Sequence, residues 1–277
     1  FKTDSDSEVV LKSYLHFGSK CFDLFEGMFS ICISDKRTNK VLIATDLFGI
    51  KPLYYSNKDG VLIIASEQTG IFSSLRSSPN LNSSSIYEYL LYQHITNNET
   101  LFEGVNKLSP GTILEYSQES LKVLNSYKIK IKEIPSSKSY SEYRQNFKEI
   151  VEDQFIDALD TDLEVTFQLS GGIDSNLLVG LASKFIPEKL NYTVSSYIEG
   201  DFDNNEAEYI KKVVAELGLR NELIPINEKN FFNELTSSIK NLGEPTGDAG
   251  VVAQHIVNKQ TSKNTKIAIA GQGADEM

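Results

Sequence analysis

The second half of the chain contains the stretch Val165-Thr166-Phe167-Gln168-Leu169-Ser170-Gly171-Gly172-Ile173-Asp174-Ser175. An apolar run that ends in two glycines and then opens into a helical pattern predicts a strand, a tight turn and a helix. Glycines let a backbone approach a phosphate closely, and a helix N-terminus favours an anion. No Lys follows the glycines, so the Walker pattern is absent. The stretch predicts a phosphate-binding loop; the alternative is a strand–turn–helix corner with Ser and Asp as caps.

The rest of the second half alternates strands with helices around this stretch. Such alternation predicts a parallel sheet with right-handed crossovers, in which ligands bind beyond the carboxyl ends of the strands. The predicted strands span 165–169, 192–197, 223–226 and 266–270, and the predicted helices span 140–159, 175–185, 205–217, 229–241 and 249–261.

A second glycine-rich turn, Gly271-Gln272-Gly273-Ala274-Asp275-Glu276, follows the last predicted strand. Two such turns on one parallel sheet place Asp174 and Asp275 at the same edge. Paired carboxylates there suit Mg²⁺ held between the protein and a triphosphate. The alternative for this turn is a surface loop with solvated acids.

The first half has a different pattern, with hairpin-like strands interrupted by helices, and it predicts an α+β unit. Its predicted strands span 28–33, 41–45, 61–65, 112–116 and 121–124, and its predicted helices span 8–17, 66–75 and 83–93. The sequence changes to turn-rich linker chemistry over 126–140. We therefore predict a first domain over 1–128, a linker over 129–140 and an α/β domain over 141–277.

Bulk composition excludes several classes of protein. Across 277 residues, 27 Lys and Arg against 38 Asp and Glu give a formal charge of −11, which disfavours non-specific binding of nucleic acid or anionic membranes. No apolar run is long enough to span a membrane, and we expect a cytoplasmic protein. Cys21 and Cys32 form no metal-binding pattern, and the apolar run around Cys32 predicts that it packs in a core.

At the two glycine turns the chain resembles the asparagine synthetase family, whose second domain is an ATP-pyrophosphatase fold with a Ser-Gly-Gly-x-Asp-Ser loop. In the first half, Asp46-Leu47-Phe48-Gly49-Ile50-Lys51-Pro52-Leu53-Tyr54-Tyr55 is similar to the family's glutaminase domain, which has an N-terminal-nucleophile-type fold. Ser66-Glu67 and Leu108-Ser109-Pro110-Gly111 fit as well. The run Thr3–Val9 resembles the turn whose second Asp, here Asp6, holds the α-amino group of glutamine.

The resemblance implies a two-site enzyme. The first domain hydrolyses glutamine, and ammonia passes through an internal tunnel to the second. There ATP adenylates a carboxylate, typically aspartate, with release of pyrophosphate, and ammonia then displaces AMP to give the amide. Mg²⁺ is the implied metal cofactor, and glutamine, ATP and aspartate or a similar carboxylate are the implied partners. A homodimer is an option that the resemblance leaves open.

The resemblance also implies roles for individual residues. Leu169 and Val194 match positions that contact the adenosine, although their pattern alone favours plain strand core. Ala270 and Gly271 match a pair that also touches the nucleotide. The residues matched to the pyrophosphate loop are Ser170, Gly171, Gly172, Asp174 and Ser175, and the residues matched to Mg²⁺ are Asp174 and Asp275.

Three departures from the family pattern limit the interpretation. The catalytic Cys is expected before Phe1, and Cys21 or Cys32 cannot replace it because its α-amino group takes part in the reaction. A helical remainder with basic residues is expected after Met277, so we expect this chain alone to be inactive. Gln272, which we assign to the catalytic site, stands where an acidic residue is often found, and a neutral amide cannot act as a general base. Glutamine does occur there in some bacterial members.

Three other functions compete with asparagine synthesis. One is a family member that amidates another carboxylate, such as a sugar acid. The second is a non-catalytic nucleotide-binding homologue, which the intact loop argues against. The third is a tRNA-modifying ATP-pyrophosphatase, which would need basic patches and reactive cysteines and fits poorly with the acidic charge.

Overall fold

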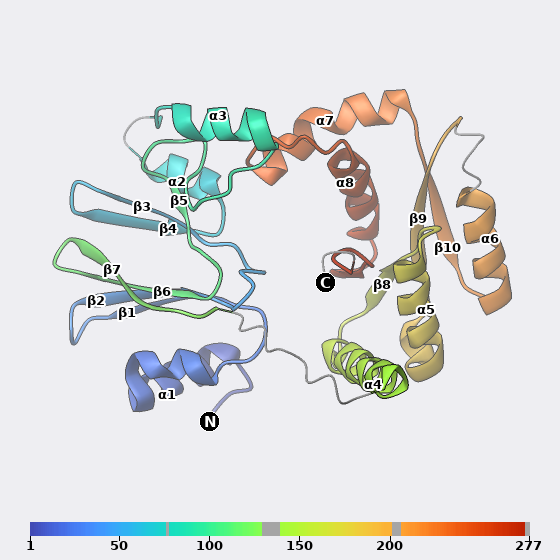
Figure 1. Ribbon diagram of the computed structural model, residues 1–277, viewed down its shortest axis with the longest axis horizontal. Helices are drawn as coiled ribbons and strands as arrows, with labels where there is room; N and C mark the ends of the chain where they lie inside the picture. Colours follow the sequence, from blue (N-terminus) through green and yellow to red (C-terminus); the bar gives the residue numbers. More distant parts are fainter. Residues whose placement is uncertain (76–77, 129–138, 201–205, 275–277) are drawn as a thin grey trace. The chain divides into compact units, whose positions relative to one another are not determined.

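The computed structural model describes residues 1–75, 78–128, 139–200 and 206–274. The chain divides into two compact units, Phe1–Lys132 and Glu133–Met277 (Figure 1). The described elements of the first unit are α1 (Asp6–Phe17), the 3-10 helix η1 (Gly18–Leu24), β1 (Ser30–Asp35), β2 (Lys40–Thr45), β3 (Tyr54–Lys58), β4 (Val61–Ala65), α2 (Gln68–Ser74), α3 (Ser83–Tyr92), β5 (Asn106–Lys107), β6 (Thr112–Ser117) and β7 (Ser120–Ser126). Those of the second unit are α4 (Tyr140–Ala158), β8 (Val165–Gln168), α5 (Ile173–Phe185), η2 (Pro187–Lys189), β9 (Thr193–Ile198), α6 (Glu206–Leu217), β10 (Asn221–Ile226), α7 (Glu228–Leu242), α8 (Gly250–Thr261) and β11 (Ile267–Ile269).

The first unit is built on two antiparallel sheets, with strand orders β1-β2-β6-β7 and β4-β3-β5. One core cluster joins them, because Ile43 of the first sheet and Tyr55 of the second belong to it. Cys21 of η1 packs with the first sheet in another cluster, and Ile71 of α2 packs with the second sheet in a third. The unit is therefore layered as helix, sheet, sheet and helix, and the N-terminal-nucleophile assignment stays a prediction.

The first unit differs from the sequence-based prediction at β3 and at Cys32, and the short elements η1 and β5 were not predicted either. Strand β3 was missed because Asn57 and Lys58 resemble turn residues. In the structure the β3–β4 turn consists only of Asp59 and Gly60, both with positive φ, as a two-residue hairpin turn requires. The predicted core position of Cys32 is wrong: its side chain is exposed on the edge strand β1, whereas Cys21 is fully buried. An apolar neighbourhood in sequence does not specify which face of an edge strand is covered.

Asp46 organises the turn that follows β2, and only 2% of it is exposed. Its carboxylate accepts hydrogen bonds from the backbone N–H groups of Phe29 (3.1 Å), Phe48 (3.1 Å), Ile50 (3.1 Å) and Lys51 (3.3 Å). Burial alone would raise the pKa of this carboxyl, but the four backbone donors outweigh burial and hold the pKa below its ordinary value. The ionised carboxylate is therefore a structural acceptor for the loop of the glutaminase-like motif.

Asp46→Asn is expected to destabilise the first unit by about 2 kcal/mol, because an NH₂ group would replace one buried acceptor oxygen. The folded-state pKa is lowered, so the contribution of Asp46 is fully present above the unfolded-state pKa and is lost as the pH falls through the folded-state pKa. Denaturant unfolding at neutral and acidic pH, followed by hydrogen exchange in the first unit, measures both effects. The exposed Asp23 provides a matched control, Asp23→Asn. Equal stability of the two variants at neutral pH would contradict the assignment.

The second unit contains a parallel sheet with the strand order β10-β9-β8-β11. Its main core cluster surrounds Phe167 of β8, which is fully buried, and includes Phe155 of α4, Val179 of α5 and Ile210 of α6. None of the helices in the described ranges is long and apolar enough to cross a membrane.

The strand order places a topological switch point in the second sheet. The chain proceeds from β8 outward through β9 and β10, and then returns to add β11 on the other side of β8. The strand order therefore reverses beside β8, and in such sheets ligands bind in the crevice beyond the carboxyl ends of the strands at this point. The two glycine turns that the sequence singled out follow these two strands.

Candidate functional site

A cavity of about 390 Å³ lies at the carboxyl ends of β8, β9 and β11. Eight of the nine residues predicted to bind ATP line it, and Gln272 lines it too. The ninth, Gly171, lies in the same loop. The eight are Leu169, Ser170, Gly172, Asp174, Ser175, Val194, Ala270 and Gly271. The tertiary structure thus brings these predicted positions to one place, while their binding roles stay predictions.

The loop between β8 and α5 is held by its own side chains. The hydroxyl of Ser175, a residue that is 6% exposed, accepts from the backbone N–H of Ser170 (3.1 Å), and the Oγ atoms of these two serines are 2.8 Å apart. Ser170 Oγ in turn accepts from the N–H of Gly172 (3.1 Å). The Asn176 amide donates to the carbonyls of Ser170 (3.0 Å) and Gly172 (2.7 Å). Both serine hydroxyls therefore shape the loop in this structure, in addition to any role toward phosphate.

The turn after β11 packs directly against the amino end of α5. A Cβ atom placed on Gly271 would lie 2.7 Å from the backbone N of Ser175 and 2.9 Å from Cβ of Asp174. Only glycine permits this approach, since real Cβ contacts essentially never fall below 3.0 Å. The N-cap residue of α5 is Gly172, which has no side chain to cap the helix, and Asp174 occupies the first turn. Free N–H groups and the dipole at such an end favour an anion.

The lining of the cavity is acidic. Among its described lining residues Asp174 and Glu206 carry negative charge, and none of them is Lys, Arg or His. A triphosphate would be repelled there unless a divalent cation intervened. Asp275, the second predicted magnesium ligand, lies outside the described residues, and within the described residues no group of three or more His, Cys, Asp or Glu could hold a metal.

For Leu169 and Val194 the sequence left two roles open, packing in the core and lining a ligand site. They are 2% and 0% exposed, and the N–H of Leu169 donates to the carbonyl of Val194 (2.9 Å). Leu169 belongs to the main core cluster of the second unit. Val194 of β9 and Leu169, which directly follows β8, are therefore both buried in the core, and both also contribute to the wall of the cavity.

Six polar residues that line the cavity were not among the predicted site residues, and they are Gln168, Ser195, Ser196, Tyr197, Glu206 and Gln254. Gln254 of α8 donates to Gln168 Oε1 (2.7 Å) at the end of β8. The position of Gln168 just before the glycine loop was an available signal, because strand ends at a switch point bind ligands. Gln254 and Glu206 are far from the loop in sequence, and no local pattern marks them.

Asp6 lies in the first unit, where it is the first residue of α1. The helix is capped by Ser5, whose hydroxyl accepts from the N–H of Ser7 (3.3 Å), and Asp6 itself is exposed. The preceding segment is tied to the helix by Glu8, which accepts from the backbone N–H groups of Lys2 (2.9 Å) and Thr3 (2.7 Å). The Asp6 carboxylate is thus presented at a well-defined helix start.

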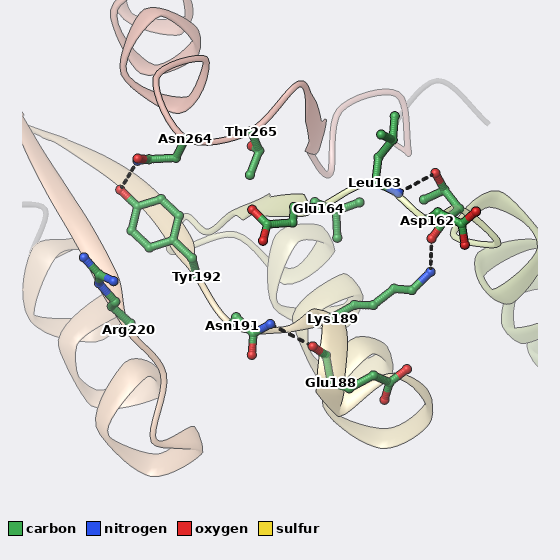
Figure 2. A pocket seen from close by; sticks show the side chains of 12 residues that line it. Asp162, Leu163, Glu164, Glu188, Lys189, Asn191, Tyr192, Arg220, Asn264 and Thr265 are labelled. Atoms are coloured by element: carbon green, nitrogen blue, oxygen red, sulfur yellow. Dashed lines mark hydrogen bonds between the residues drawn. The ribbon is translucent and has the colours of Figure 1, made fainter.

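A second cavity, of about 450 Å³, lies at the opposite, amino-terminal ends of the parallel strands (Figure 2). Its contacts stabilise the fold: Lys189 Nζ donates to the carbonyls of Leu159 (2.5 Å) and Thr161 (2.6 Å) after α4. Arg220 lies 5.6 Å from the ring centre of Tyr192, whose pKa is raised to about 12 by burial and by its hydrogen bond to Glu222. Ligands of such sheets bind at the carboxyl ends, so this cavity is not where the sequence-predicted nucleotide site is expected.

Comparison with known proteins adds two family matches. Residues 1–128 match the family model of a glutamine amidotransferase domain, and residues 144–277 match that of asparagine synthase. Glutamine-hydrolyzing asparagine synthetases 1 and 2 of Bacillus subtilis are 27% and 29% identical to the chain, and that of Mus musculus is 24% identical, each over 100% of this chain.

The chain spans only part of these relatives, namely 43%, 39% and 50% of their respective lengths. Among solved structures, a glutamine-dependent NAD+ synthetase from Acinetobacter baumannii is 13% identical and aligns over 99% of this chain and 66% of its own. Its TM-score of 0.35 is too low to indicate a shared fold.

Proposed function

This chain belongs to the asparagine synthetase family, and we propose that it forms part of an enzyme that uses ATP and glutamine to convert a carboxylate, most simply aspartate, into its amide. The observation that carries the proposal is the meeting of the two glycine turns on one cavity at the switch point of the second sheet. A parallel sheet binds nucleotides there, and the loop after β8 has the composition that phosphates need.

In the proposed reaction the acceptor carboxylate attacks the α-phosphorus of ATP, and pyrophosphate leaves. Ammonia then attacks the acyl carbon, and AMP leaves. The chain contributes backbone N–H groups at the amino end of α5, which would bind the phosphates without a nucleophilic side chain. The buried pair Leu169 and Val194 would form the apolar side of the adenosine site and exclude water from it.

The donor set at the cavity suits Mg²⁺, because it offers carboxylate oxygens and no cationic side chain. We propose that Asp174 holds the ion together with Asp275. When bound, Mg²⁺ would neutralise the charge of the leaving pyrophosphate. Gln272 lines the same cavity and is proposed to face the acceptor. Its neutral amide can donate and accept hydrogen bonds but cannot remove a proton.

The glutamine half of the proposal rests on the match of the first unit to an amidotransferase domain and on Asp6. Asp6→Asn in the full-length protein is expected to raise the KM for glutamine strongly, because bound glutamine would partly desolvate this site and loss of one charge partner there costs on the order of 2–5 kcal/mol. Ammonia-dependent amide synthesis bypasses that pocket and should persist. Coupled assays with either glutamine or ammonium chloride as the nitrogen source measure the glutamine-dependent and the ammonia-dependent activity separately.

Asp4→Asn is the matched control, because Asp4 is also exposed and lies two residues away. Equal loss of glutamine-dependent and ammonia-dependent synthesis in Asp6→Asn would show that Asp6 supports folding. The same assay tests the whole proposal: the full-length protein should form AMP, pyrophosphate and an amide from ATP, ammonia and aspartate. If AMP forms only with another carboxylate, such as a sugar acid, the acceptor assignment changes.

A further inference from the structure

Glu206 touches the predicted phosphate loop from a distant part of the chain. The backbone N–H of Gly171 donates to Glu206 Oε1 at 2.8 Å. A Cβ atom placed on Gly171 would lie 3.0 Å from Glu206 Cγ, so the glutamate chain also lies flat against the loop. Glu206 is the first residue of α6, and its side chain lines the candidate nucleotide cavity.

This contact differs from the hydrogen bonds that the two neighbouring N–H groups of the loop make. The N–H groups of Ser170 and Gly172 donate to serine hydroxyls inside the loop. The Gly171 N–H instead points out of the loop to a carboxylate. A carboxylate and a phosphate oxygen are chemically similar acceptors, because both are anionic oxygens that form charge-assisted hydrogen bonds with backbone N–H groups. Glu206 Oε1 therefore accepts a hydrogen bond from an N–H group that a phosphate oxygen would use if a phosphate bound to this loop.

The surroundings favour departure of Glu206 when a phosphate enters. No cationic lining residue within the described part of the chain pairs with it, and Asp174 adds a second negative charge to the same cavity. A triphosphate and the Glu206 carboxylate would compete for one donor and would repel each other. A bound nucleotide can take the Gly171 N–H only if this hydrogen bond breaks first.

We propose that Glu206 is an internal competitor for the phosphate subsite, a carboxylate that holds the Gly171 N–H in the free protein and must be displaced by the phosphates of ATP. The proposal rests on the proposed function, since it takes ATP as the ligand of this cavity. Glu206 would then lower the affinity for phosphate-bearing ligands and leave the affinity for adenosine unchanged, because adenosine has no group that needs the Gly171 N–H.

Glu206→Ala in the full-length protein is expected to bind Mg-ATP and inorganic pyrophosphate on the order of tenfold more tightly than the wild type, the typical worth of a hydrogen bond to a charged group. Glu206→Gln keeps a hydrogen-bond acceptor but removes the charge, so its affinity for Mg-ATP and pyrophosphate should lie between those of the wild type and Glu206→Ala. Isothermal titration calorimetry with Mg-ATP, pyrophosphate and adenosine measures the three affinities. Thermal unfolding verifies that the variants are folded.

Glu208→Gln is the matched control, because it removes one negative charge from the same first turn of α6 at an exposed position. It should leave Mg-ATP affinity unchanged, which excludes a general effect of charge. Weaker or unchanged Mg-ATP binding by Glu206→Ala would overturn the proposal and would make Glu206 a support of the loop or of the metal. Failure of the wild-type protein to bind Mg-ATP at all would instead overturn the proposed function.

Discussion

Asp174→Asn in the full-length protein should lower ATP–pyrophosphate exchange by about a hundredfold or more, as expected for the loss of a major stabiliser of transition-state charge. Asp174 occupies the first turn of α5, next to the glycine loop, and lines a cavity without cationic lining residues among those described. A carboxylate in this place is unfavourable for a triphosphate unless a divalent ion lies between them. The asparagine amide keeps the shape but not the charge that holds the ion.

Three measurements separate a metal role of Asp174 from a structural one. The defect of Asp174→Asn should shrink as the Mg²⁺ concentration rises, because a weakened metal site is filled by mass action. Glutamine hydrolysis at the first unit should persist. The exposed Asp160, in the same unit, gives the control variant Asp160→Asn, which should exchange pyrophosphate normally. Near-normal pyrophosphate exchange by Asp174→Asn at ordinary Mg²⁺ concentrations would show that Asp174 does not bind the metal and serves only to stabilise the first turn of α5.

Gly271→Ala is the second substitution with a large expected effect, and it acts through packing. The added Cβ would lie 2.7 Å from the backbone N of Ser175 and about as close to Asp174, so the backbone of the turn or of α5 must move. Overpacking of this kind costs about 1–3 kcal/mol, and more where backbone must shift. Movement of either turn also displaces the N–H groups of the loop. We expect lower stability of the second unit and severe loss of ATP–pyrophosphate exchange.

Gly180→Ala is the matched control for this substitution. Gly180 lies within α5, and a Cβ placed there meets no atom within 4 Å. Alanine is favoured over glycine in a helix by up to about 1 kcal/mol, so this variant should be as stable as the wild type or more stable. Comparison of thermal unfolding and exchange in the two variants isolates the steric effect. Normal exchange by Gly271→Ala would mean that the two turns move apart freely.

Most elements of the second unit follow from local patterns in the sequence. The predicted strand at 165–169 and the helix at 175–185 correspond to Val165–Gln168 and Ile173–Phe185. Apolar periodicity and glycine positions suffice there, because they depend on neighbours within a few residues. The same patterns misplaced Cys32 and missed β3. The exposure of Cys32 depends on which layer covers its face of β1, and β3 forms because it pairs with β4 and β5.

The candidate site likewise contains residues that local sequence identifies and contacts that only the tertiary structure creates. Ser170, Gly171, Gly172, Asp174 and Ser175 were predicted together because a phosphate-binding loop is a local structure that contiguous residues encode. The second turn was also found locally, but its contact with α5 through Gly271 exists only because the sheet order places β11 beside β8.

Glu206 and Gln254 show what only the tertiary structure decided. Each meets a residue of the β8 loop region across a long separation in sequence, Glu206 through Gly171 and Gln254 through Gln168. Backbone conformation responds to local composition, whereas a contact between distant segments depends on the packing of whole elements, which no short pattern specifies. The sequence by itself therefore determined the strand, the turn and the helix that offer N–H groups to an anion. The tertiary structure placed Glu206, at the start of α6, so that its carboxylate accepts a hydrogen bond from one of these groups.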